Sequence, residues 1–469
     1  MEVVDKEALN SSYPEVQYKM NGKTVVASEE EKQNLNLVII GHVDSGKSTL
    51  SGKILHTFGI VSNQQLRANE RKAEVNNKTG FQFAYIMDET DEEQERGVTI
   101  EVTTRHFTTP NRNFTILDAP GHRDFIANMI TGAAQANCGI LVIDVGPSQF
   151  ERGWEGGNGT TREHAMLARS LGVTQLVVAF NKMERVGYEE GRFEHIKNLV
   201  QPFLLNIGFG LKDLYFVPIS AIAGENVTHR ATEPALTSWY GTESKTLIDV
   251  LDGLRLPQRS YSKPLRVTIS DFLQKHTGPL IGDCVMAKVE SGVIIEKRDL
   301  LLMPHNVLVG IKGITRSEQS VQYALGGAII EVGLRLPSDF DINYLRRGNV
   351  LCDPENPIKL VHTFIARLVI YDLGTRGAVC KGEPVMIHSY SAKGPGKLQQ
   401  FISVIDQATG EVVRSRPKFL RKGMFVNVQI KLQERQCLEL FSNMKTIGRI
   451  VVRQEDYTIA AGTILEFLA

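Results

Sequence analysis

An eight-residue string near the start of the chain combines the residue types that bind phosphate. It matches the pattern G-x-x-x-x-G-K-[ST] and reads Gly41-His42-Val43-Asp44-Ser45-Gly46-Lys47-Ser48. Glycines let successive backbone N–H groups point at phosphate oxygens, Lys47 brings a positive charge to the β- and γ-phosphates, and the Ser48 hydroxyl can ligate Mg²⁺. A strand-like apolar run precedes the string, and a segment with helical spacing starts at Thr49. This context predicts nucleotide contacts from His42 to Thr49, whereas a chance match would lie in an ordinary glycine turn.

The next strong strand ends in a second string, Asp118-Ala119-Pro120-Gly121. We expect Asp118 to hold Mg²⁺ through a water and the Gly121 N–H to bind the γ-phosphate, so that this turn senses whether that phosphate is present. His122 follows directly and is predicted to be catalytic, because a polar side chain here can orient the attacking water. In isolation the string would be a plain β-turn and the histidine a structural residue, but their adjacency favours chemistry.

The segment between these strings has the properties of a switch. It runs from Gly59 to Glu95, is long and polar, and leads into Gly97-Val98-Thr99. The Thr99 hydroxyl can ligate Mg²⁺ when the γ-phosphate draws the loop inward. A disordered insertion is the alternative, and both descriptions can hold in the GDP state.

Two further strings are expected to read the base. Asn181-Lys182-Met183-Glu184 resembles NKxD, in which the acid accepts hydrogen bonds from guanine N1 and N2 and thereby rejects adenine. Here Glu184 is one methylene longer, so we predict guanine preference with weakened affinity. A second base-contacting loop is expected at Ser220-Ala221-Ile222.

The elements around these strings divide the chain into domains. Apolar strand-like runs alternate with helical segments as far as about residue 258, which predicts a mostly parallel sheet with helices on both faces. From Lys263 onward, short strands are separated by Gly, Pro and Asn turns, as in β-barrels. We therefore expect an α/β P-loop GTPase domain followed by two all-β barrel domains. The expected boundaries are a mobile N-terminal tail at 1–33, the P-loop domain at 34–258, and barrels at 259–357 and 358–469.

Composition excludes several other classes of protein. Lys plus Arg and Asp plus Glu both number 53, so global charge does not indicate a nucleic-acid binder. The five scattered cysteines form no CxxC pair, which argues against a disulfide framework and for a reducing compartment. The chain begins without a basic and apolar leader, and no run of 18 apolar residues occurs. The expectation is a cytoplasmic protein with no membrane partner, monomeric on its own.

Longer strings resemble the elongation factor 1 alpha family of translational GTPases. Two of them are the phosphate loop extended to Leu50 and the second string extended to Phe125. Three others are Asn128-Met129-Ile130-Thr131-Gly132, Gly448-Arg449-Ile450-Val451-Val452-Arg453 and Thr458-Ile459-Ala460-Ala461-Gly462. The resemblance runs from about Leu35 to the end of the chain. It implies ribosome-stimulated hydrolysis of GTP to GDP and phosphate with Mg²⁺.

Within that family, several strings look most like the GTPase that partners Pelota in ribosome rescue. Examples are Gly132-Ala133-Ala134-Gln135-Ala136, Leu351-Cys352-Asp353-Pro354 and Thr409-Gly410-Glu411-Val412. This likeness implies that the GTP form carries a tRNA-mimicking partner of the Pelota type into the ribosomal A site, where ribosomal RNA presses His122 into its catalytic pose. Val43 and Val98 occupy the positions of a hydrophobic gate that holds His122 back. The termination GTPase and the elongation factor that delivers aminoacyl-tRNA remain alternatives.

Some features depart from the family pattern. Besides Glu184, the turn Lys297-Arg298-Asp299 lacks the usual glycine before the aspartate, and the rescue and termination relatives carry a longer N-terminal extension. A basic cluster in the last domain could meet ribosomal RNA or an acidic partner, or be a solvated hairpin: Arg414, Arg416, Lys418, Arg421 and Lys422. Two more distant functions also stay open, a GTP-regulated binding module with little turnover and a sulfate-activating P-loop enzyme.

Overall fold

A computed structural model describes most of the chain. The described residues are 3–6, 15–20, 23–26, 34–78, 80–88, 90–154, 159–257, 259, 261–276, 280, 282–371, 373, 377–455 and 457–468. The chain divides into two compact units, one of residues Leu35–Pro257 and one of Gln258–Ala469 together with Met1–Asn34. Each unit is described by itself.

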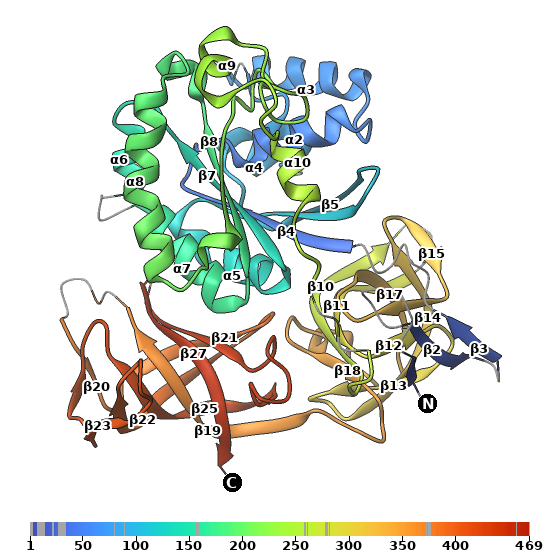
Figure 1. Ribbon diagram of the computed structural model, residues 1–469. Helices are drawn as coiled ribbons and strands as arrows, with labels where there is room; N and C mark the ends of the chain where they lie inside the picture. The colour runs from blue at the N-terminus through green and yellow to red at the C-terminus, as the bar shows by residue number, and fades with distance from the viewer. Residues whose placement is uncertain are drawn as a thin grey trace. The chain divides into compact units, whose positions relative to one another are not determined.

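The first unit is built on a six-stranded sheet with the order β5-β6-β4-β7-β8-β9. Four of its strands are parallel neighbours: β4 (Asn34–Ile40), β7 (Cys138–Asp144), β8 (Gln175–Asn181) and β9 (Leu214–Pro218). At one edge, β5 (Thr103–Thr108) runs antiparallel to β6 (Asn113–Asp118). Every residue of β7 and β8 is buried, as expected when helices cover both faces of a sheet (Figure 1).

The helices of this unit follow the strands in alternation. They are α2 (Lys47–Thr57), α3 (Asn63–Val75), α4 (Asp91–Arg96), α5 (Ile126–Gln135), α6 (Gln149–Trp154), α7 (Thr161–Leu171), α8 (Glu190–Asn206), α9 (Pro234–Tyr240) and α10 (Leu247–Asp252), with short 3-10 turns η1 (Ala84–Ile86), η2 (Arg123–Phe125), η3 (Met183–Val186) and η4 (Leu211–Asp213). The poorly patterned segment after Gly59 contains two of these helices. Ser62 and Thr90 start α3 and α4 with reciprocal capping boxes, which stabilise helices that have little apolar periodicity.

The second unit contains two closed barrels. In the first, six strands form a ring in the order β13-β18-β10-β11-β17-β14, closed by pairing of β13 with β14. The ring strands are β10 (Arg266–His276), β11 (Gly282–Ser291), β13 (Asp299–Met303), β14 (Val307–Arg316), β17 (Ile329–Arg335) and β18 (Val350–Cys352), with β12 (Val293–Ile295), β15 (Gln319–Val321), β16 (Tyr323–Leu325) and the turn η5 (Ile342–Tyr344) outside the ring. Lys297 adopts a positive φ of 59° at the turn that lacks the usual glycine, and the fold continues through it.

The second barrel repeats this plan in the order β21-β26-β27-β19-β25-β22, closed by pairing of β21 with β22. Its ring strands are β19 (Lys359–Ile370), β21 (Pro384–Ser389), β22 (Ala392–Ile405), β25 (Phe425–Leu438), β26 (Arg449–Gln454) and β27 (Tyr457–Leu468), accompanied by β20 (Val379–Cys380), β23 (Val412–Ser415) and β24 (Phe419–Leu420). The predicted fold class, an α/β domain followed by two β-barrels, is confirmed. Among the described residues, no helix is long and apolar enough to cross a membrane.

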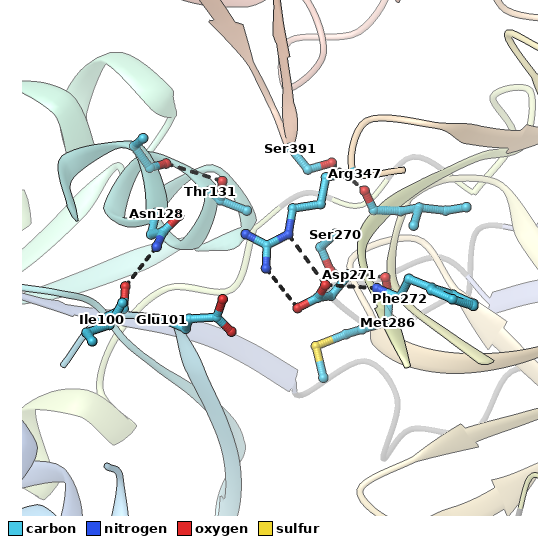
Figure 2. Close-up of polar contacts among 12 residues, drawn as sticks. Ile100, Glu101, Asn128, Thr131, Ser270, Asp271, Phe272, Met286, Arg347 and Ser391 are labelled. Atoms are coloured by element: carbon cyan, nitrogen blue, oxygen red, sulfur yellow. Dashed lines mark hydrogen bonds and ion pairs between the residues drawn. The ribbon is translucent and has the colours of Figure 1, made fainter. Parts of the chain in front are cut away.

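Polar and apolar contacts join the two barrels. The buried side chains of Arg266 and Glu439 form an ion pair with a 3.0 Å N···O distance, one partner from each barrel. The Ser391 hydroxyl donates to the Ile269 carbonyl at 2.7 Å. Figure 2 shows Ser391 together with an ion pair inside the first barrel, in which an Arg347 nitrogen lies 3.0 Å from Asp271 Oδ2. The barrels therefore form one compact unit.

The N-terminal segment contains more regular structure than its polar composition indicated. Its described residues form a three-stranded antiparallel sheet of β1 (Val3–Lys6), β2 (Glu15–Met20) and β3 (Lys23–Val26). The predicted mobility of residues 1–33 stays a prediction, and the other residues of that segment lie outside the described ones.

Candidate nucleotide-binding site

The predicted phosphate loop joins the end of β4 to the start of α2. Gly41 has a φ of 148°, and a Cβ there would lie 2.3 Å from the Val142 carbonyl oxygen. Gly46 has a φ of 95°, and a Cβ there would lie 2.4 Å from Asn181 Nδ2. Both positions therefore require glycine. Gly46 is also the N-cap residue of α2 and supplies no side-chain cap, so the first N–H groups of this helix remain available to an anion.

Lys47 places a buried amine beside the second string. Its side chain is only 6% exposed, and Nζ donates to the His42 carbonyl at 2.9 Å. A Cβ at Gly121 would lie 2.3 Å from Nζ, so this glycine is packed directly against the amine. Burial lowers the pKa of Lys47 to about 8, although the Asp118 and Asp44 carboxylates oppose this shift. A bound phosphate would stabilise the charged form of the amine.

The residues predicted to hold magnesium converge beside Lys47. Ser48 Oγ lies 3.0 Å from Thr99 Oγ1, which donates to Asp88 Oδ1 at 3.0 Å. Asp118 is fully buried, and neither of its carboxylate oxygens has a hydrogen bond of standard geometry within the described part of the chain. Burial raises the pKa of Asp118 to about 6 and that of Asp88 to about 7. The negative charge of Asp118 also contributes to the raised pKa of Asp88.

This donor set fits Mg²⁺. Magnesium prefers oxygen ligands and is usually held by one or two carboxylates together with substrate phosphates. The two buried carboxylates would regain their usual ionisation beside a cation. No group of three His, Cys, Asp or Glu side chains suited to a metal occurs among the residues described, so hydroxyls and a nucleotide would complete the site. A further unsatisfied group, the buried Ser45 hydroxyl, fits a phosphate oxygen.

His122 lies at the mouth of this site, not inside it. Its side chain is 45% exposed, and Nδ1 accepts a hydrogen bond from the Asp124 N–H at 3.3 Å. The ring lies 5.9 Å from the ring of Phe125, measured between centroids. It is close enough to His42 to help lower the pKa of that residue, after burial and the charge of Lys47. The side chain is thus near the phosphate loop but bonded to its own turn.

The predicted base-reading strings are tied to the phosphate loop through Asn181. Asn181 Nδ2 donates to the Ser45 carbonyl at 2.8 Å, while its Oδ1 accepts from the Ala221 N–H at 2.9 Å. Lys182 Nζ donates to the Asp44 carbonyl at 2.5 Å and pairs with Asp144 at 2.8 Å. The structure therefore brings both base-reading strings to one side of the loop.

The Glu184 side chain is not bonded to the phosphate loop as those of Asn181 and Lys182 are. Its side chain is exposed in η3, and within the described residues it has no hydrogen bond or ion pair. Of the second string, Ser220 is fully buried and Ile222 is 49% exposed. The acid that should read guanine is thus placed in solvent at the edge of the site.

Three residues that shape the site were not predicted from the sequence. Asp88 completes the carboxylate pair, and Asp144 orients Lys182. Buried Glu93 accepts hydrogen bonds from the N–H groups of Ile100, at 2.8 Å, and Glu101, at 3.2 Å. Glu93 thereby holds the loop that carries Thr99. The T-x-x-E capping spacing at Thr90 could have identified Glu93, but no local signal marks the other two.

Comparisons with known proteins identify similar sequences and a similar fold. A family model of the elongation factor Tu GTP binding domain matches residues 32–279, and one described as GTP-eEF1A C-terminal domain-like matches residues 363–465. Protein HBS1 of Drosophila melanogaster is 37% identical over 435 residues, which cover 93% of this chain but only 63% of HBS1. Elongation factor 1-alpha of Coccidioides immitis is 37% identical over 444 residues, 93% of this chain and 95% of that protein. The solved Ski7 GTPase-like domain of S. cerevisiae bound to GTP shares the fold over 93% of this chain and 98% of that one, with a TM-score of 0.73 at 18% identity.

Proposed function

Because the chain belongs to the family of translational GTPases that includes elongation factor Tu and elongation factor 1-alpha, we propose that it delivers a tRNA-mimicking partner of the Pelota type to the A site of stalled ribosomes. The delivery serves ribosome rescue and mRNA surveillance of the no-go type. The observation that carries this proposal is the 37% identity to HBS1 over 93% of the chain, together with the strings that resemble the rescue GTPase. The equal identity to elongation factor 1-alpha makes delivery of aminoacyl-tRNA the second candidate.

The phosphate-binding residues position GTP for attack. The N-terminus of α2, Lys47 and the Ser45 hydroxyl hold the phosphates, and the Gly121 N–H meets the γ-phosphate. Ser48, Thr99 and Asp118 would hold Mg²⁺, with Asp88 beside them. When bound, the cation would supply positive charge beside the phosphate oxygens.

His122 orients the attacking water once it leaves its bond to the Asp124 N–H. Contact with ribosomal RNA moves the His122 ring into its catalytic position. Val43 and Val98 restrain the ring before that contact. Loss of the γ-phosphate then frees the loops that carry Thr99 and Gly121, and the partner is released.

Guanine is read by the string that begins at Asn181 and by the string at Ser220–Ile222, which the Asn181 side chain joins. Lys182 and Ala221 line the base site with Ser220 and Ile222, and Glu184 turns inward to accept from guanine N1 and N2. The protein works in the cytoplasm with GTP, GDP and Mg²⁺, as a monomer until it meets its partner and the ribosome.

Partner binding tests the proposal. The chain is loaded with a non-hydrolysable GTP analogue or with GDP, and calorimetry measures its affinity for a purified Pelota-type protein, a termination factor and aminoacyl-tRNA. We expect binding of the Pelota-type protein, tighter with the analogue. Tight binding of charged tRNA would support elongation instead, and selective binding of the termination factor would support termination.

A further inference from the structure

Thr160 links the phosphate loop to the turn that carries His122. Its side chain is 2% exposed, and Oγ1 lies 3.1 Å from His42 Nδ1 and 3.1 Å from the Gly121 carbonyl oxygen. A threonine hydroxyl has one proton and a carbonyl can only accept. Thr160 therefore donates to Gly121 and accepts from the Nδ1–H of His42, which fixes the tautomer of that ring.

This pair of bonds connects Lys47 to the catalytic turn. The backbone carbonyl of His42 accepts from Lys47 Nζ at 2.9 Å, so His42 is held by its backbone on one side and by its ring on the other. The Gly121 carbonyl belongs to the planar peptide that joins Gly121 to His122. Fixing that carbonyl fixes the plane from which the His122 side chain departs.

The Thr160 hydroxyl does not make the hydrogen bond that a threonine usually makes at the start of a helix. Thr160 is the N-cap residue of α7, where a threonine side chain normally accepts from a backbone N–H of the first turn. Here the side chain makes no cap hydrogen bond. The His42 ring is also confined on another side, because a Cβ at Gly153 would lie 3.1 Å from His42 Cβ. The Thr160 hydroxyl therefore joins two loops instead of stabilising the first turn of α7.

We propose that Thr160 is a positioning residue that couples occupation of the phosphate loop to the orientation of the Gly121–His122 peptide. The inference rests on the proposed role of His122 in hydrolysis. Thr160 needs no contact with nucleotide or water for this role, since it acts through His42 and Gly121. Removal of the Thr160 hydroxyl leaves the phosphate-binding groups in place. The Gly121–His122 peptide can then change its orientation independently of those groups.

The test compares Thr160→Val, which keeps the shape and removes the hydroxyl, with Thr160→Ser, which keeps the hydroxyl. Single-turnover GTP hydrolysis is measured with and without ribosomes and a Pelota-type protein, and GDP affinity is measured in parallel. We expect Thr160→Val to slow hydrolysis by roughly tenfold, with GDP affinity retained and with the rate restored in Thr160→Ser. Thr131→Val in α5 is the matched control, because among the described residues its hydroxyl bonds within its own helix, to the Ala127 carbonyl; it should hydrolyse GTP at the wild-type rate.

Three outcomes would overturn the inference, and a fourth would count against the proposed function. A wild-type rate for Thr160→Val would overturn the inference, and so would an equal loss of GDP affinity and rate in both Thr160 variants, since that pattern means a structural role. In a His122→Ala background, Thr160→Val should cost nothing further, and an additive loss would also overturn it. Failure of ribosomes to stimulate the wild-type chain would instead count against the proposed function, and the Val-to-Ser comparison then decides the inference on intrinsic turnover.

Discussion

At the scale of single residues, burial prepares the nucleotide-binding site for a charged ligand. Asp118 and Lys47 are both buried, and burial moves the pKa of each toward neutrality. The pKa of the Asp118 carboxyl is raised to about 6 and that of the Lys47 amine is lowered to about 8. The charged forms of both groups are therefore destabilised by burial. A nucleotide with its cation would offset that destabilisation. Residue type and spacing predicted both positions, whereas the burial that alters them comes from the fold.

Glu184 is the clearest departure from the family at this scale. Shortening it in Glu184→Asp should tighten GDP and GTP binding by roughly tenfold, about 1.4 kcal/mol, because the acid then reaches guanine without a shift of its loop. Fluorescent-nucleotide titration measures the change, with exposed Glu189→Asp as the matched control. Weaker binding by Glu184→Asp would show that the loop has adapted to the longer side chain.

His164 gives the first unit a pH dependence. It is fully buried, its Nδ1 accepts from the Gly41 N–H at 3.3 Å, and burial lowers its pKa to about 3. The unfolded chain therefore binds the proton more tightly, and stability present above pH 6.5 is lost as pH falls. Between pH 6.5 and 5 the loss should be about 2 kcal/mol. Denaturant unfolding followed by tryptophan fluorescence measures it, since Trp154 and Trp239 both lie in this unit.

The matched variants are His164→Gln, which should flatten this slope, and exposed His229→Gln, which should leave it unchanged. A slope equal to that of the wild type in His164→Gln would assign the acid sensitivity to other groups.

At the scale of elements, local spacing identified the phosphate loop and the turn after β6, because each is one continuous string at the end of a strand. The neighbouring switch segment was less predictable. Asp88 reaches the site because η1 folds the polar segment back against α2, where the Phe83 backbone packs on Gly52, and these elements are far apart in the sequence. Glu93 follows in α4. The acid of the base-reading string was identified from its spacing, but its exposed position was not.

Glu93 is the residue whose removal should loosen this switch element. Glu93→Gln replaces one acceptor oxygen with a donor, so part-buried N–H groups lose a partner at a cost of about 1 kcal/mol. Hydrogen exchange of the backbone at Ile100 and Glu101 should quicken in the GTP-analogue form, and GTP affinity should fall more than GDP affinity. Exposed Glu95→Gln serves as the control. Unchanged exchange in Glu93→Gln would mean that the nucleotide alone orders the loop.

At the scale of the whole molecule, the chain consists of a nucleotide-binding unit and a unit of two barrels. Strand periodicity predicted the barrels, since turns every ten residues are visible in the sequence. Their union through Arg266 and Glu439 was not predictable, because these residues are 173 positions apart and ordinary in their local context. Hydrolysis in the first unit and partner release by the whole chain are the two events that the proposed cycle must connect.

GTP turnover with stalled ribosomes tests that connection most directly, in the presence and absence of a Pelota-type protein. We predict that turnover rises by about 100-fold only when ribosomes and the partner are both present, and that His122→Ala binds GTP yet loses the increase. Turnover that ignores the partner, or that rises with aminoacyl-tRNA in its place, would contradict the account.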